Sequence, residues 1–183
     1  LFPFSLNLQS FLTELTNPTP SVFVATTLLF LRKRVFADLL IVTTSSMSSM
    51  YSQTINGVKE FIDTQKYTAK ETSVKTYITI RTFDNIVEKM VDGVDINEME
   101  IDIKYLKPRG TTRLIDTVCE AIYEQKRRLS EYKESDTYQT GQTNVCRILA
   151  VLTDGEDNKS TLYSVENMKN LIEKQSKEGL VAM

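Results

Sequence analysis

Residues 145–155, with the sequence VCRILAVLTDG, decide the fold of this chain. The nearly continuous apolar run at residues 145–153 is typical of a central parallel strand that is covered on both faces. Asp154 and Gly155 follow at the end of this run, and open α/β sheets place their ligands at the carboxyl ends of such strands. We therefore expect a buried strand that delivers the Asp154 carboxylate to a functional edge of a sheet.

A similar unit lies earlier in the chain. Residues 37–42 predict a short buried strand, and the hydroxyl-rich run TTSS at residues 43–46 follows it directly. Beyond this loop, Ser52 could cap a helix, because the apolar side chains at residues 55, 58, 61 and 62 recur at helical spacing. The order is that of a strand–loop–helix unit.

The middle of the chain predicts a hairpin. Residues 74–83 alternate, with Thr76 and Ile78 on one face and Thr79 and Arg81 on the other, as expected of a half-buried strand. A turn at residues 84–85 leads to residues 86–91, which predict an antiparallel edge strand. Residues 97–107 are ambiguous, and the Pro-Arg-Gly sequence at residues 108–110 ends whatever precedes it.

Two helices and a final strand complete the pattern. Apolar spacing predicts a long helix at residues 112–132, whose outer face carries Glu124, Lys126, Arg127 and Arg128. Residues 134–144 are polar and indicate a surface loop. A second amphipathic helix is expected around residues 162–172, and residues 180–182 could begin a further strand.

Together these elements predict an α/β fold: a Rossmann-like, open, mostly parallel sheet with one antiparallel edge strand and helices on both faces. Residues 1–36 show no sustained period, and we treat them as an N-terminal extension of unknown structure. Residues 37–183 form the predicted domain, which looks incomplete at its C-terminal end.

Composition removes several classes of function. The 22 Lys and Arg residues nearly balance the 24 Asp and Glu residues, so the net charge of −2 gives no footprint for nucleic acid or for an anionic membrane surface. The chain has no histidine, which excludes His-based catalysis and the commonest zinc ligand. Cys119 and Cys146 lack a CxxC spacing, so we expect two core thiols. The lack of disulfide pairing weakly favours a cytoplasmic location.

Three separated segments could supply hard oxygen ligands to one metal ion. They are the hydroxyl-rich run at residues 43–46, the turn at residues 109–112, and the loop at residues 152–157. The hydroxyls of Thr44, Ser46 and Thr112, with the carboxylate of Asp154, suit Mg²⁺, or Mn²⁺ or Ca²⁺, and leave room for water and one outside ligand. Thr112 could also cap the helix that starts there, and Asp116 could orient a ligand from outside the coordination shell.

From residue 37 onward the chain resembles a von Willebrand factor type A (vWA) domain, the fold that carries the metal-ion-dependent adhesion site. The family pattern is Asp-x-Ser-x-Ser after the first strand, a Thr in a Gly-rich loop, and Thr-Asp-Gly after the fourth strand. The likeness extends to TINGVKEFI at residues 54–62, FD at 83–84, PRGTTRLID at 108–116 and VLTDGEDN at 151–158. It looks closest to the small stand-alone A domains of bacteria, viruses and protists.

The chain departs from this pattern at one position. Aligning Ser46 and Met47 with the family's Ser-Met places Thr44 and Ser46 on the two motif serines and Val42 on the motif aspartate. Val42 cannot supply a carboxylate, so metal affinity is in doubt. Asp38 is no obvious substitute, because four residues of extended chain span about 13 Å.

The resemblance implies a protein-interaction module, not an enzyme, whose metal ion is completed by an Asp or Glu of a partner protein. Two alternatives stay open. One is a metal-free scaffold in which only the shape of the domain is kept. The other is a Mg²⁺-dependent phosphoryl-transfer enzyme, because a carboxylate at a strand end beside a Thr-rich loop could hold both metal and phosphate.

Overall fold

The computed structural model describes residues 34–100, 110–135, 138, 145–154 and 156–183. The predicted α/β architecture is confirmed: a five-stranded sheet has the strand order β3-β2-β1-β4-β5. The strands are β1 (Arg34–Val42), β2 (Lys75–Phe83), β3 (Val87–Asp95), β4 (Val145–Leu152) and β5 (Leu180–Ala182). The helices are the 3-10 helix η1 (Ser45–Met50) and the α-helices α2 (Tyr51–Thr72), α3 (Leu114–Glu134) and α4 (Val165–Lys177).

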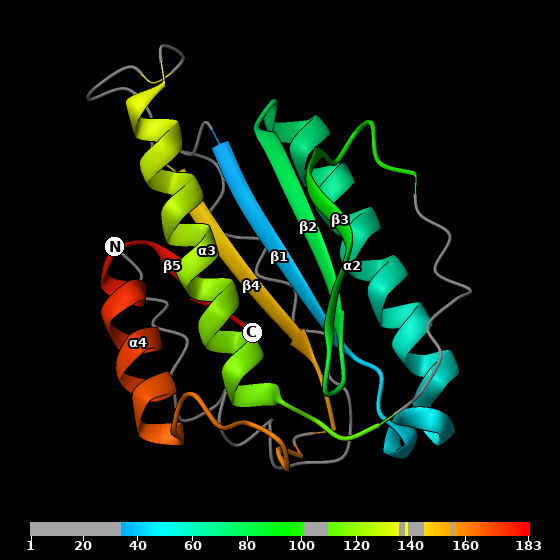
Figure 1. The fold of residues 1–183 in the computed structure, drawn as a ribbon. Helices are drawn as coiled ribbons and strands as arrows, with labels where there is room; N and C mark the ends of the chain where they lie inside the picture. Colours follow the sequence, from blue (N-terminus) through cyan, green and yellow to red (C-terminus); the bar gives the residue numbers. More distant parts are fainter. Residues whose placement is uncertain (1–33, 101–109, 136–137, 139–144, 155) are drawn as a thin grey trace, which may run out of the picture.

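Strand β1 is the centre of this sheet. It runs parallel to β2 on one side and to β4 on the other, β5 continues the parallel part, and β3 is antiparallel to β2. Helix α2 covers one face of the sheet, and α3 and α4 cover the other (Figure 1). The single antiparallel edge strand and the helices on both faces were predicted from the sequence.

Alternate side chains of β1 point into two separate apolar cores. Leu39 and Ile41 pack with α2, whereas Leu40 and Val42 pack with α3 and α4. A strand buried on both faces needs apolar residues at nearly every position, which explains its continuous hydrophobic run. Both predicted core thiols, Cys119 and Cys146, are buried, and neither forms a disulfide.

Strand β1 begins at Arg34, three residues before the predicted start. Arg34 and Phe36, at the start of this strand, contact aromatic rings. The guanidinium carbon of Arg34 lies 4.0 Å from the ring centroid of Tyr132 and 5.0 Å from that of Tyr77, and Phe36 contacts both rings. Cation–π contacts of this kind leave no apolar run in the sequence, so the prediction missed them.

The predicted Ser52 cap of the first helix is wrong. The 3-10 helix η1 continues directly into α2, whose N-cap residue is Met50 and has no side-chain cap. The helix ends at Ser73, which adopts the left-handed conformation with φ 55° and donates its backbone N–H to the carbonyl of Lys70.

Arg147 is the polar exception in β4, and it has a structural role. Its side chain is buried and donates to Gln175 Oε1 at 2.8 Å and to the backbone carbonyls of Gln175 and Glu178 at 3.3 Å. Those carbonyls lie at the C-terminal end of α4, where a cation is favoured by the helix dipole. Arg147 therefore docks α4 on the sheet.

The expectation that β2 is half-buried is wrong. Thr79 and Arg81, placed on the solvent face by their alternation, are 1% and 3% exposed and lie under α3. Arg81 forms an ion pair with Asp38 of β1, which is 1% exposed, and a second one with Glu124 of α3 at 3.0 Å. The polar face of this strand is thus a second buried surface.

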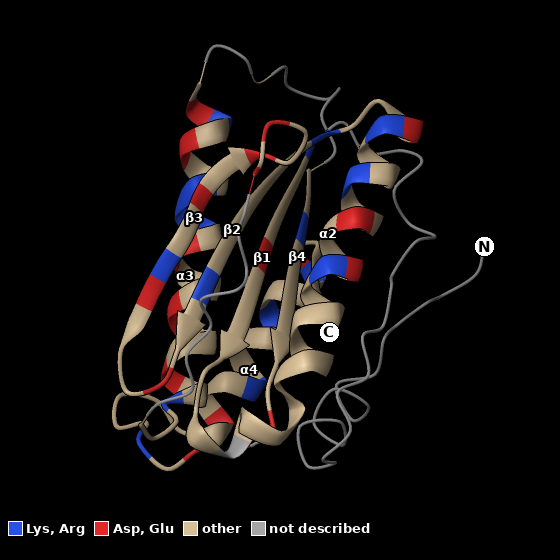
Figure 2. Ribbon diagram, turned by 90° about the vertical axis from the view of Figure 1, so that its right-hand side faces the viewer, with Lys and Arg blue, Asp and Glu red and all other residues tan. Residues whose placement is uncertain are grey.

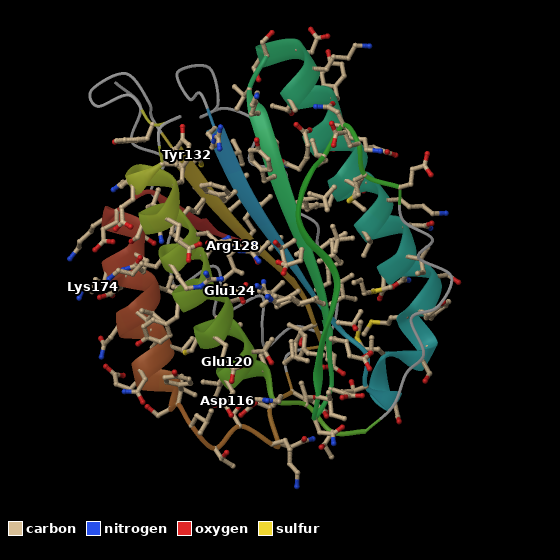
Figure 3. The ribbon with its side chains drawn as sticks, turned by 45° about the horizontal axis from the view of Figure 1, so that its top comes forward. Asp116, Glu120, Glu124, Arg128, Tyr132 and Lys174 are labelled. Atoms are coloured by element: carbon tan, nitrogen blue, oxygen red, sulfur yellow. The ribbon has the colours of Figure 1, made fainter. Side chains whose placement is uncertain are left out.

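Glu124 and Arg128 were expected on the outer face of their helix, and this is wrong too. Both side chains lie on the side of α3 toward the sheet (Figure 3), where Glu124 accepts from Lys89 of β3 at 2.6 Å and from Arg128 at 2.8 Å. Arg128 also pairs with Asp92 of β3. Lys126 and Arg127 are exposed, as predicted. The ion pairs therefore link α3 to β2 and β3.

The environment shifts the pKa values of the Asp38 and Glu124 carboxyl groups in opposite directions. Burial raises the pKa of Asp38, and the charge of Arg81 and a hydrogen bond from Gln125 only partly offset it. Partial burial alone would raise the pKa of Glu124, but the hydrogen bond from Lys89 and the charges of Arg81 and Arg128 lower it to about 2.

The outer strand of the described sheet is charged along its length. Strand β3 carries three acidic residues and one basic residue (Figure 2), namely Glu88, Asp92, Asp95 and Lys89. Gly93, with φ +65°, lies near the irregular stretch of its pairing with β2. Charges and irregular pairing discourage a sheet edge from pairing with another chain. Among the described residues, no helix has the length and apolar character needed to cross a bilayer.

The buried pair makes a direct prediction for stability. Arg81→Met leaves Asp38 buried without its cation and should lower the free energy of unfolding by about 3 kcal/mol. The double variant Asp38→Leu, Arg81→Met should lose less than Arg81→Met alone, because neither charge is then stranded. Urea unfolding measures both, with the exposed Arg127→Met as the control, expected to lose under about 1 kcal/mol. The single variant Asp38→Leu completes the cycle, and a double-variant loss equal to the sum of the two single losses would show that the residues are not coupled.

Glu124 should dominate part of the acid response. Its folded pKa of about 2 lies below the ordinary value of 4.5, so its ion pairs stabilise the fold fully above pH 4.5. That contribution is lost as pH falls from 4.5 toward 2. In Glu124→Gln, the decline of unfolding free energy across this window should be shallower than in the parent, as measured by denaturant unfolding at each pH. Equal slopes would mean that the surrounding cations do not hold this carboxylate.

Candidate functional site

The ends of β1 and β4 bring two of the predicted loops to one edge of the sheet, at the lower end of Figure 1. Ile41 of β1 pairs with Leu152 of β4 in a parallel register. Thr44 lies three residues beyond Ile41, and Asp154 lies two residues beyond Leu152. The two loops therefore leave adjacent strands at the same level.

The turn after β2 joins the same edge. Thr43 donates its backbone N–H to the carbonyl of Phe83 at 2.8 Å, and Arg113 donates to the carbonyl of Asp84 at 3.0 Å. Asp84 is fully buried, and its Oδ1 accepts the N–H of Ile86 at 2.7 Å. The sequence analysis gave Asp84 as a turn residue and as part of the likeness at residues 83–84 but not as a site residue, whereas the structure places it between the β1 loop and the start of α3.

The loop that carries Asp154 is bonded to the segment that carries Thr112. Thr112 donates its N–H to Asn158 Oδ1 at 2.8 Å, and Asn158 returns its N–H to the carbonyl of Thr112 at 3.0 Å. This reciprocal pair of hydrogen bonds holds the two loop segments side by side. Asn158 was not predicted as a site residue, and the likeness at residues 151–158 was the signal that contained it.

The expectation that Thr112 caps its helix is wrong. The N-cap residue of α3 is Arg113, which has no side-chain cap. The first-turn N–H groups of Ile115 and Asp116 are accepted instead by Asp157 Oδ1 at 3.4 Å and Ser160 Oγ at 3.0 Å. A helix leaves its first N–H groups without internal partners, and here the segment after β4 satisfies two of them.

As a consequence, the hydroxyl of Thr112 is left over. Thr112 is 1% exposed, and its Oγ1 is one of the buried polar atoms that have no hydrogen-bond partner. An unpaired buried hydroxyl costs about 1–3 kcal/mol. The atom is thus a buried hard oxygen without a hydrogen-bond partner at the carboxyl edge of the sheet.

The other predicted ligands are placed less completely. Thr44 is buried, and its carbonyl accepts the N–H of Met47 at 3.1 Å at the start of η1. Ser46 belongs to η1, but its side chain lies outside the described part of the chain. Asp154 is half-buried, and its Oδ1 accepts the N–H of Glu156 at 3.3 Å.

Val42, at the motif aspartate position, and Asp38, on the same strand, both have other roles. Val42 is 2% exposed and packs into the core under α3. Asp38 is paired with Arg81 in the middle of the sheet. Among the described residues, no group of three or more Cys, Asp and Glu side chains is placed to hold a metal ion. The candidate set differs from such a group, since it has one carboxylate and three hydroxyls.

Asp116 ties α3 to the following segment. Burial alone would raise its pKa, but hydrogen bonds from the backbone N–H groups of Thr161, Tyr163 and Leu162, with the charge of Arg113, lower it. Figure 3 shows Asp116 at the end of α3 nearest the site. Asp157 is exposed, and its Oδ1 accepts the N–H of Ile115.

In comparisons with known proteins, no family model and no curated protein matches this chain.

Gly110 allows the turn after β2 and the start of α3 to approach closely. Its φ is +69°, and a Cβ at this position would lie 2.9 Å from Asn85 Oδ1. Gly93 has a similar φ of +65°, but a Cβ there would meet only Arg128 Nη1 at 4.0 Å. The two glycines have similar positive φ values, but only Gly110 lacks room for a Cβ.

This difference gives a matched pair of variants. Gly93→Ala should cost about 1–2 kcal/mol for the left-handed backbone alone, and Gly110→Ala should cost more because Asn85 must move. In an Asn85→Ala background the excess cost of Gly110→Ala should disappear. Urea unfolding of the four variants measures this. Equal costs for the two glycine variants would show that the turn is not packed as described.

Proposed function

We propose that this chain is a protein-interaction module of the vWA type that binds a partner through a divalent metal ion. Thr44, Ser46, Thr112 and Asp154 would hold Mg²⁺ or Mn²⁺ at the carboxyl edge of the sheet. Mg²⁺ takes few protein ligands and keeps several waters, so this set is sufficient in number.

The observation that carries the proposal is the unpaired Oγ1 of Thr112. Its N–H and its carbonyl are both bonded to Asn158, so only the hydroxyl is left for a ligand. A neutral oxygen in a buried position suits a hard cation. Thr44 and Asp154 lie at the ends of adjacent strands on the same edge, which supports a shared ligand.

The charge of the set supports binding in preference to catalysis. One carboxylate against a divalent cation leaves a net positive charge on the ion and its four proposed ligands. An Asp or Glu from a partner would neutralise that charge and fill a coordination position. The ion would supply electrostatic attraction and a directional bond to the partner.

Val42 favours a second candidate. Its side chain is part of the apolar core, so the position that should provide the motif carboxylate contributes only packing. Under this alternative the domain is a metal-free scaffold whose loops bind a partner by shape.

A thermal titration separates the two. An ion that binds only the folded chain raises its stability, by about 2.7 kcal/mol at a hundredfold excess over Kd. The parent should therefore unfold at a higher temperature as Mn²⁺ or Mg²⁺ is added, and Asp154→Ala should not respond. Thr112→Val should be at least as stable as the parent without metal, because it removes the unpaired hydroxyl, but it should lose the response.

Val42→Asp completes the design. With a latent metal site it should respond at lower Mn²⁺ concentration than the parent, because a second carboxylate joins the set. If no variant responds, including this one, the metal-free scaffold is the function that is left.

A further inference from the structure

The carboxylate of Asp116 accepts hydrogen bonds from three consecutive backbone amides. Its Oδ1 accepts from Leu162 at 3.1 Å and from Tyr163 at 3.0 Å, and its Oδ2 accepts from Thr161 at 3.0 Å. Asp116 itself is 2% exposed. Hydrogen bonds to an ionised carboxylate are about twice as strong as neutral ones. One buried side chain therefore fixes the backbone of a whole turn.

The same two segments are also bonded in the opposite direction. Asn158, Asp157 and Ser160 accept the N–H groups of Thr112, Ile115 and Asp116, so the segment after β4 caps the helix. Ser160 Oγ in turn donates to Asp157 Oδ1 at 2.6 Å. The start of α3 and residues 157–163 are thus joined along their length, with Thr112 and Asp154 at the two sides of the joint.

We propose that Asp116 is a positioning residue: it holds residues 157–163 against α3 and so sets where Asp154 lies relative to Thr112. The sequence predicted that Asp116 orients a ligand. Its observed contacts suggest that it would do so indirectly, by holding the backbone of the neighbouring loop. The consequence for metal affinity rests on the proposed function, but the positioning of the loop does not.

Asp116 is the anchor of this joint because of its burial and its charge. Asp157 is exposed, and Asn158 and Ser160 are neutral. Arg113 lies 3.7 Å from Asp116 Oδ2 but is bonded more closely to Glu120, at 2.7 Å. The charge of Asp116 is therefore directed mainly to the three amides.

The first measurement is amide hydrogen exchange of the full chain without metal. Asp116→Asn keeps the shape of the side chain and removes its charge and one acceptor. The amides of residues 161–163 should exchange at least tenfold faster than in the parent, relative to the amides of β1. The control is Asp63→Asn, which makes the same change at an exposed carboxyl group of α2, on the other face of the sheet, and there the ratio between these regions should stay at the parent value. An unchanged ratio in Asp116→Asn overturns the proposal.

The second measurement is Mn²⁺ affinity of the same variants. Loss of a residue that orients a ligand typically weakens metal binding 10- to 100-fold, and we expect a loss of about this size in Asp116→Asn and none in Asp63→Asn. Equal affinity in parent and Asp116→Asn overturns the proposal. If the parent binds no metal, the proposed function fails and the exchange ratio alone decides the role of Asp116. Ser160→Ala, which removes one bond of the joint, serves if Asp116→Asn does not fold, and it should speed exchange in the same amides.

Discussion

The structure depends on the ion pair between Asp38 and Arg81. Strand β1 is covered on both faces, so a carboxylate in its middle must find a cation inside the protein, and Arg81 of the adjacent strand provides it. Arg81 then reaches Glu124, which is also bonded to Lys89 and to Arg128. A buried pair of this kind selects one arrangement more than it adds stability, because most other arrangements strand a charge. The register of β1 and β2, the docking of α3 and the position of β3 follow from the same contacts.

Helix α3 carries this constraint to the functional edge. Its middle is held to the sheet by Glu124 and Arg128, and its first turn is held to the segment after β4 by Asp116. Because the capping of that first turn comes from the other segment, Thr112 keeps its hydroxyl unpaired. A change in the docking of α3 would therefore move Thr112 and the loop of Asp154 together. The geometry of the candidate site is a property of the helix as a whole.

The features that could be predicted from the sequence are those in which burial produces a regular spacing of apolar residues. The apolar runs of β1 and β4 and the apolar stripe of α3 gave the α/β architecture, the antiparallel edge strand and the edge where the loops gather. The errors concern polar residues whose partners lie far along the chain. Arg81 looks solvent-exposed by alternation, yet it bonds to residues 43 positions before and after it. Local residue spacing does not reveal partners that lie far along the chain. For the same reason, the capping of α3 by Asp157 and Ser160 was not predicted.

Val42 and Thr112 constrain the proposed function from opposite sides. A metal-free scaffold accounts for the apolar core at Val42, but it gives no reason for a buried hydroxyl without a partner, since valine would fill the same space without the cost of an unpaired polar atom. A metal site accounts for the hydroxyl and loses a carboxylate at Val42. Mg²⁺ keeps several waters, so one missing carboxylate lowers affinity and leaves the coordination number intact. A weak site of this kind would bind its ion and the partner's carboxylate cooperatively, because each raises the affinity of the other by the same factor. The proposed module would then hold its metal firmly only while the partner is bound.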